Sequence, residues 1–241
     1  MQEPKHGASV KEILQREPSF SLNRSPQAIV YSKKSKLQAV VLSRVLNSLS
    51  MSFVPTVPLA EFNLFVAPYA ELSYVWAFID NQDDLTRFTH VVKSLKVEAT
   101  VFSPKGVKAD IEFDEPYVLT SVVETIKAVL KNHPSSKRAE SLQSALTPEG
   151  IEDYLRTKLV EIGDREPLVS PVFEPANEYV GVKSAFEEPS RKEVAIIASS
   201  ADNLVVRRRT FELMRRGFST KEVLVDVDPA IAPIYLLFLF S

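Results

Sequence analysis

The sequence predicts an α/β protein with two lobes, residues 1–131 and 132–241, each a parallel sheet wrapped by helices. Three observations lead to this prediction. Apolar runs of strand length alternate with segments of helical periodicity, which is typical of βαβ units with right-handed crossovers. The run YVWAFI at residues 74–79 is apolar throughout, as expected for a strand buried on both faces. A polar stretch at residues 132–137, NHPSSK, separates the two halves.

The first lobe is expected to begin with a short amphipathic helix, which Pro18 ends, and then to alternate strands and helices. Pro55 and Pro58 lie in the second strand and favour an edge position for it, because proline has no N–H to donate to a sheet. The strands are expected over residues 27–31, 53–59, 74–79, 98–102 and 110–113. The helices are expected over residues 9–17, 37–49, 85–95 and 118–130.

The second lobe is expected to open with a helical stretch over residues 142–162 that breaks at 147–150, followed by short apolar pieces among prolines and acidic residues. Its last third is clearer, with two strands around a helix that Gly217 ends. These elements are expected over residues 193–198, 204–216 and 222–227. The apolar segment 231–240 is expected to be a buried helix or core segment, because a membrane span needs about 18 apolar residues.

Composition excludes several classes of site. The chain has no cysteine, which excludes disulfides, thiol nucleophiles and cysteine-bound metals. His6, His90 and His133 lie far apart, so we expect neither a metal nor a cofactor. A formal charge of -2 provides no basic field for nucleic acid. The N-terminus lacks an apolar signal core and no run is long enough for a membrane span, so a cytoplasmic location is expected.

Glycine is scarce and proline is abundant, with 6 and 16 residues among 241. The glycines are too widely spaced for a dinucleotide-binding fingerprint or a P-loop. High proline together with sparse asparagine and glutamine is a pattern also found in heat-stable proteins.

Two loops at the expected carboxyl ends of strands are candidate binding sites. Residues 32–36 carry three lysines and two serines just before a helix, which suits an anion; the alternative is a solvated loop. Residues 80–84 carry three aspartates, which complement the dipole of the next helix, and Asp80, Asn81 or Asp83 can cap it. The functional alternatives for this loop are a hard-cation site or recognition of a cationic ligand.

A third candidate is the arginine-rich helix near the end of the chain. Its guanidinium groups suit phosphate or an acidic partner, whereas such a run on a helix is otherwise a solvated face. The arginines are Arg207, Arg208, Arg209, Arg215 and Arg216.

Several segments, taken in order, carry a family resemblance. They are residues 10–18 (VKEILQREP), 31–35 (YSKKS), 58–62 (PLAEF), 77–88 and 111–130, and more weakly 176–178. Their order and spacing resemble the sugar isomerase (SIS) family, in particular the tandem-SIS isomerase domain of glucosamine-6-phosphate synthase. The resemblance implies two SIS-like, flavodoxin-like lobes of three αβα layers, binding of a carbohydrate derivative such as a sugar phosphate, and a homodimer.

The resemblance also implies where a ligand would bind, since the family holds phosphate with hydroxyl and backbone groups of the first two loops. Ser35 matches one of these hydroxyls, and Lys34 replaces a threonine. Lys33 and Gln82 stand where the family has glycine. The ligand-binding candidates are Ser32, Lys33, Lys34, Ser35, Asp80, Asn81 and Asp84. Aspartates in place of hydroxyl donors would repel a phosphate.

This sequence has no residues that match the catalytic groups of the family. Its proton-moving glutamate falls at Ala185, and Glu178, Glu187 and Glu188 are the nearest candidates for a relocated base. The segments that supply a histidine and a C-terminal lysine have no counterpart. Three functions follow: a non-catalytic or altered carbohydrate-binding protein, an active phosphosugar isomerase, or a scaffold or regulatory homodimer.

Overall fold

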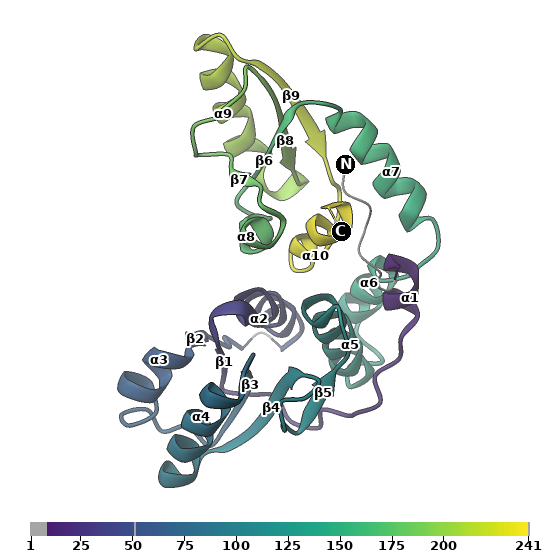
Figure 1. Ribbon diagram of the computed structural model, residues 1–241. Helices are drawn as coiled ribbons and strands as arrows, with labels where there is room; N and C mark the ends of the chain where they lie inside the picture. Colours follow the sequence, from purple (N-terminus) through teal and green to yellow (C-terminus); the bar gives the residue numbers. More distant parts are fainter. Residues whose placement is uncertain (1–8, 51, 241) are drawn as a thin grey trace. The chain divides into compact units, whose positions relative to one another are not determined.

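The computed structural model describes residues 9–50 and 52–240, and its internal contacts divide the chain into two compact units, Met1–Leu146 and Thr147–Ser241. Figure 1 shows the elements of both. The division lies later than the boundary at 131 expected from the sequence, because helix α6 (Lys137–Ala145) packs against helices α2 and α5 of the first unit. Each unit is built on a parallel sheet, so the α/β fold class is confirmed.

The first unit has a five-stranded parallel sheet in the order β2-β1-β3-β4-β5. The second strand is at the edge, as its prolines predict, and β3 is buried along its whole length. The strands are β1 (Ala28–Tyr31), β2 (Thr56–Pro58), β3 (Tyr74–Phe78), β4 (Glu98–Pro104) and β5 (Ile111–Phe113). Chain order reverses around β1, which lies between β2 and β3, and such a point is where open α/β sheets bind ligands.

The helices of the first unit form a layer on each face of the sheet (Figure 1). They are α1 (Val10–Gln15), η1 (Lys33–Ser35), α2 (Lys36–Ser50), α3 (Leu59–Glu61), η2 (Phe62–Val66), α4 (Gln82–Leu95), α5 (Tyr117–Lys131) and α6. The sequence did not predict α3 and the π-helical η2. They form because Leu59, Phe62 and Ala67 turn into the core, where the ring of Phe62 lies 5.6 Å from that of Phe88.

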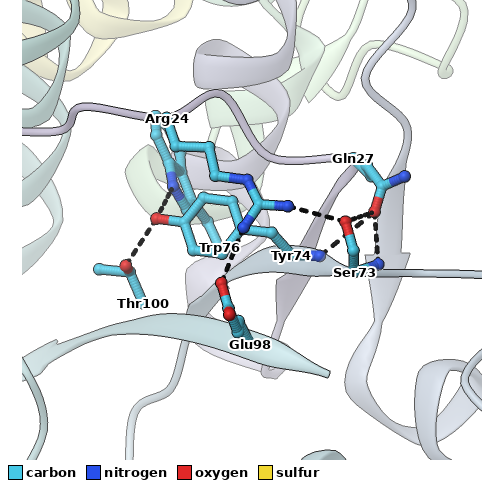
Figure 2. Close-up of polar contacts among 7 residues, drawn as sticks. All are labelled: Arg24, Gln27, Ser73, Tyr74, Trp76, Glu98 and Thr100. Carbon is cyan, nitrogen blue, oxygen red and sulfur yellow. Dashed lines mark hydrogen bonds and ion pairs between the residues drawn. The ribbon is translucent and has the colours of Figure 1, made fainter. Parts of the chain in front are cut away.

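A polar network closes the amino edge of this sheet, opposite the loops considered above (Figure 2). Gln27 Oε1 accepts hydrogen bonds from the N–H of Ser73 at 2.6 Å, the N–H of Tyr74 at 3.2 Å and the Ser73 hydroxyl at 3.0 Å. Arg24 donates to Glu98 at 2.7 Å and to Ser73 at 2.8 Å, and its guanidinium lies 4.7 Å from the centre of the Tyr74 ring. These contacts set where β3 begins relative to its neighbours.

The Tyr74 hydroxyl extends this network into the core. It lies 2.7 Å from the Thr100 hydroxyl and accepts from Trp76 Nε1 at 3.1 Å. Tyr74→Phe is expected to destabilise the first unit by about 1–2 kcal/mol, because the buried indole N–H loses its acceptor. Because Trp76 is the only tryptophan, its emission maximum should also shift. Thr100→Val is the matched control, because it removes the outer partner of the Tyr74 hydroxyl. If the emission maximum were unchanged in Tyr74→Phe as well as in Thr100→Val, the prediction would be contradicted.

The second unit has a four-stranded parallel sheet in the order β7-β6-β8-β9. Its strands are β6 (Glu166–Val169), β7 (Lys183–Ser184), β8 (Glu193–Ala198) and β9 (Ser219–Leu224). The last strand begins three residues before the predicted 222–227, because its pairing with β8 starts at Ser219. The four strands repeat the order of the first unit, where β1 likewise lies between the next two strands and β4 follows outside β3.

The helices of the second unit include the predicted arginine-rich helix and the apolar C-terminal segment. They are α7 (Ile151–Ile162), η3 (Glu174–Ala176), α8 (Asn177–Val180), η4 (Ser200–Asp202), α9 (Asn203–Arg215) and α10 (Ala232–Phe240). Helix α10 packs against α7, α8 and η3, and nearly all of its residues are buried, as predicted. In the described part of the chain, no helix is long and apolar enough to cross a membrane.

Candidate functional site

The loops that follow β1 and β3 meet at the carboxyl edge of the first sheet. Ser32 joins them: its N–H donates to the carbonyl of Phe78 at 2.9 Å, and its hydroxyl oxygen accepts from the N–H of Asp80 at 2.9 Å. Ser32 is buried, with 3% of its surface exposed. The parallel register pairs Tyr31 with Phe78, so the residues immediately after both strands are placed side by side.

The carboxylate of Asp80 lies at the start of the helical segment that η1 and α2 form. One oxygen accepts from the N–H of Lys34 at 2.9 Å, and the other accepts from the hydroxyl of Ser35. Ser35 is fully buried. The free N–H groups at such a helix start favour negative charge. The anion that the lysine–serine loop was predicted to hold is thus supplied, in this structure, by the neighbouring loop of the same chain.

Asp80 does not cap the helix that follows it in sequence. The N-cap of α4 is Asn81, whose Oδ1 accepts from the N–H of Asp84 at 2.9 Å while its amide donates to the Asp84 carboxylate at 2.9 Å. Asp83 lies exposed in the first turn. Of the capping alternatives, Asn81 is therefore the one realised, because the tie to Ser32 turns Asp80 toward α2 instead.

The structure therefore brings together part of the predicted set. Ser32, Ser35, the backbone of Lys34 and Asp80 are in contact, whereas Asn81 and Asp84 pair with each other at the start of α4. The Lys33 and Lys34 residues are exposed. No group of three or more residues suited to hold a metal ion occurs among the residues that the structure describes.

Two tyrosines that the sequence did not indicate as site residues border this cluster. The Tyr117 hydroxyl, from the start of α5, lies 3.5 Å from the Ser35 hydroxyl. Tyr31 ends β1, and burial, together with the nearby carboxylate of Glu61, raises the pKa of its hydroxyl. Tyr117 directly follows the proline that precedes α5, but nothing in its local sequence connects it to a loop 82 residues earlier.

The second unit repeats this arrangement with other residues. The N–H of Ser170, after β6, donates to the carbonyl of Ile197 at 2.9 Å, as Ser32 does to Phe78. The N–H of Val172, two residues further, donates to Asp202 at 3.2 Å, as Lys34 does to Asp80. In both units the carboxylate of an internal aspartate thus accepts a hydrogen bond from the N–H of the third residue after the strand, β1 in the first unit and β6 in the second.

The candidate glutamates lie in the second unit. Glu187 accepts from the N–H of Ser184 at 2.9 Å, and Glu178 is exposed on α8. The exposed Glu188 pairs with Arg216 at 2.6 Å, and the hydrogen bond from this guanidinium lowers the pKa of Glu188. A carboxylate that abstracts a proton near neutral pH works best with a raised pKa, so this contact acts against that role for Glu188.

Of the five candidate arginines, four lie in α9 and Arg216 is its C-cap, and two of the five, Arg209 and Arg216, hydrogen-bond to the segment after β7. Arg209 is buried and donates to the carbonyls of Ala185 at 2.6 Å and Glu187 at 3.0 Å, and Arg216 holds Glu188. Arg207, Arg208 and Arg215 are exposed.

Comparison with known proteins bears on the fold. No protein family model and no curated protein sequence matches the chain. Several solved structures do match. Glucosamine-6-phosphate deaminase from Thermotoga maritima is 14% identical with a TM-score of 0.62, over 95% of this chain and 87% of that one.

Two further structures cover the chain in the same way. Tagatose-6-phosphate ketose/aldose isomerase from Escherichia coli is 8% identical with a TM-score of 0.55, over 88% of this chain and 80% of that one. The C-terminal domain of glucosamine-fructose-6-phosphate aminotransferase from Francisella tularensis is 13% identical with a TM-score of 0.50, over 95% and 84%. The resemblance to sugar isomerases expected from the sequence is thus confirmed for the fold, which this chain shares with these phosphosugar enzymes.

Proposed function

We propose that the protein binds a carbohydrate derivative at the carboxyl edge of the first sheet, with a phosphate site altered by Asp80. Each unit would then be an SIS-like lobe, and the loops after β1 and β3 would contact the ligand. The shared fold and the position of these loops at the reversal of strand order support this proposal.

The contact between Asp80 and the start of α2 carries the proposal. A phosphate at that helix start would need the N–H of Lys34 and the hydroxyl of Ser35, and both are bonded to the Asp80 carboxylate. A phosphate beside that carboxylate would also be repelled, at about 4 kcal/mol for two unit charges 4 Å apart near a protein surface. The ligand would therefore approach this edge with hydroxyl or amino groups, from which the aspartate carboxylates can accept hydrogen bonds.

Calorimetric titration with glucosamine and fructose, each with and without a 6-phosphate, tests the proposal. We expect the wild-type protein to bind at least one unphosphorylated sugar no more weakly than its phosphate ester. The absence of heat and of a thermal shift with all of them would refute the binding function.

Asp80→Ser is expected to reverse this preference. The variant removes the internal carboxylate and adds a hydroxyl, so the affinity for the 6-phosphate ester should rise at least about tenfold relative to the wild type. Asp83→Ser is the matched control, because it removes the same charge three residues away, in the first turn of α4, where there is no contact to Lys34 and Ser35. Equal gains in both variants would show a general charge effect and contradict the role assigned to Asp80.

The contacts of the candidate glutamates favour binding over isomerisation. Glu187 holds the backbone of its own loop, and Glu188 is paired with Arg216. Neither arrangement supplies a carboxylate poised for proton transfer between adjacent carbons.

A further inference from the structure

Helix α9 carries apolar and cationic side chains together on the side that faces solvent. The buried residues of this helix are Val206, Arg209 and Leu213. Leu204, Phe211 and Arg215 follow one another at intervals of seven and four residues, so they lie along one line on the opposite side. We call this side the outer face of α9; it consists of Leu204, Arg207, Arg208, Phe211, Met214 and Arg215.

The apolar members of the outer face are well exposed. Leu204 is 84% exposed, Phe211 62% and Met214 58%. Arg207 and Arg208 come three and four residues after Leu204, so their side chains leave the helix on the two sides of the central line. The outer face therefore has an apolar centre with a guanidinium group on each flank.

The positive charge of the outer face is not neutralised within the chain. Residues 203–216 hold five arginines against one glutamate, although the whole chain has a formal charge of -2. Arg209 and Arg216 are paired with Glu212 and Glu188. The arginines of the outer face form no ion pair with any carboxylate of residues 9–50 and 52–240; they are Arg207, Arg208 and Arg215.

We propose that the outer face of α9 binds reversibly to the surface of an anionic lipid bilayer, with the helix lying parallel to the membrane. The guanidinium groups would contact lipid phosphates, and the side chains of Leu204 and Phe211 would enter the boundary between headgroups and acyl chains. Arginine suits this position because its aliphatic stem can follow apolar surface while the charged end stays among the phosphates.

Two properties of the outer face favour a bilayer over other anionic partners. A nucleic acid would use the arginines but would leave Leu204 and Met214 in water, since phosphate contacts supply most of such binding. An acidic protein would need a groove shaped to the convex surface of the helix, whereas a fluid lipid surface adapts to it. The bilayer interface takes up the apolar and the cationic side chains together.

Co-sedimentation with lipid vesicles tests the charged part of the proposal. The vesicles consist of phosphatidylcholine alone or of an equal mixture with phosphatidylglycerol. We expect the wild type to bind the mixed vesicles at least about tenfold more tightly, and added salt to weaken this binding. The variant with Arg207→Gln, Arg208→Gln and Arg215→Gln should bind them roughly a hundredfold more weakly, because three cations leave the anionic surface.

A second variant tests the apolar part. Leu204→Gln with Phe211→Gln keeps all the arginines and should still weaken binding to the mixed vesicles at least about tenfold. Glutamine is a good helix former, so α9 should remain folded in both variants, which circular dichroism checks. If the apolar variant bound like the wild type, the contact would be electrostatic adsorption only, and the proposal would be overturned.

The controls make the same changes on the first unit. Leu64→Gln with Phe65→Gln removes two exposed apolar side chains from η2. A second control removes three exposed cations from α4 and its C-cap, with Arg87→Gln, Lys93→Gln and Lys96→Gln. Both should bind the mixed vesicles like the wild type. Equal losses in the controls and in the α9 variants would contradict the role assigned to the outer face.

A tryptophan placed in the outer face reports insertion directly. The emission of Phe211→Trp should move to shorter wavelength when the mixed vesicles are added, because the indole leaves water. Phe53→Trp is the matched control, since Phe53 is 82% exposed on the first unit, and its emission should not move. Absence of vesicle binding by the wild type would overturn the proposal, including the case in which an acidic protein or a nucleic acid occupies the outer face.

Discussion

Phe102→Ala is expected to lower the free energy of unfolding of the first unit by about 4 kcal/mol. Phe102 is fully buried on β4 and forms the centre of an aromatic cluster. Its ring stacks on that of Phe78 at 4.5 Å and meets the rings of Trp76 at 5.8 Å and Phe20 at 6.4 Å. Truncation removes these contacts and leaves a cavity between the sheet and the chain segment that carries Phe20.

Trp76 reports this change directly, since its ring contacts that of Phe102. Urea titration followed by tryptophan emission measures the loss of stability. Phe53→Ala is the control, because Phe53 is 82% exposed and its truncation should cost less than about 0.5 kcal/mol. Similar midpoints for Phe102→Ala and the wild type would show that the cluster is not the core that the structure describes.

Arg209→Ala is expected to destabilise the second unit by about 3 kcal/mol. The buried guanidinium donates to the carbonyls of Ala185 and Glu187 and pairs with Glu212 at 3.1 Å. It thereby holds the segment after β7 against α9. Without the side chain, these carbonyls lose a charged donor, and no other arginine of the helix is directed toward them.

Arg208→Ala is the matched control for Arg209, one position away in the same run of arginines. Arg208 is exposed, so in dilute solution its removal should change stability by less than about 0.5 kcal/mol. Arg209→Lys should be intermediate, because it keeps the charge and loses the forked donor geometry. Circular dichroism is the suitable probe, since Trp76 lies in the first unit. Equal losses for Arg208→Ala and Arg209→Ala would contradict the structural role of Arg209.

Several elements could be predicted because their patterns are local. The apolar run at β3 indicated a buried strand, and the prolines around β2 indicated an edge. The segment over η2 could not be predicted, since FNLFV has no distinct helical pattern and its conformation depends on how Phe62 packs against Phe88. From the sequence, helix α6 is predicted to belong to the second lobe. Its packing on α2 and α5 instead assigns it to the first unit.

The sequence by itself determined the alternation of strands and helices, and with it the parallel sheets and the loops at which polar residues collect. Only the tertiary structure decided what those residues do. Asp80 and Ser35 are 45 positions apart, and they meet because the register of β1 and β3 places their loops together. Arg208 and Arg209 are adjacent and chemically identical, and a rotation of about 100° around α9 makes one a surface group and the other a buried donor.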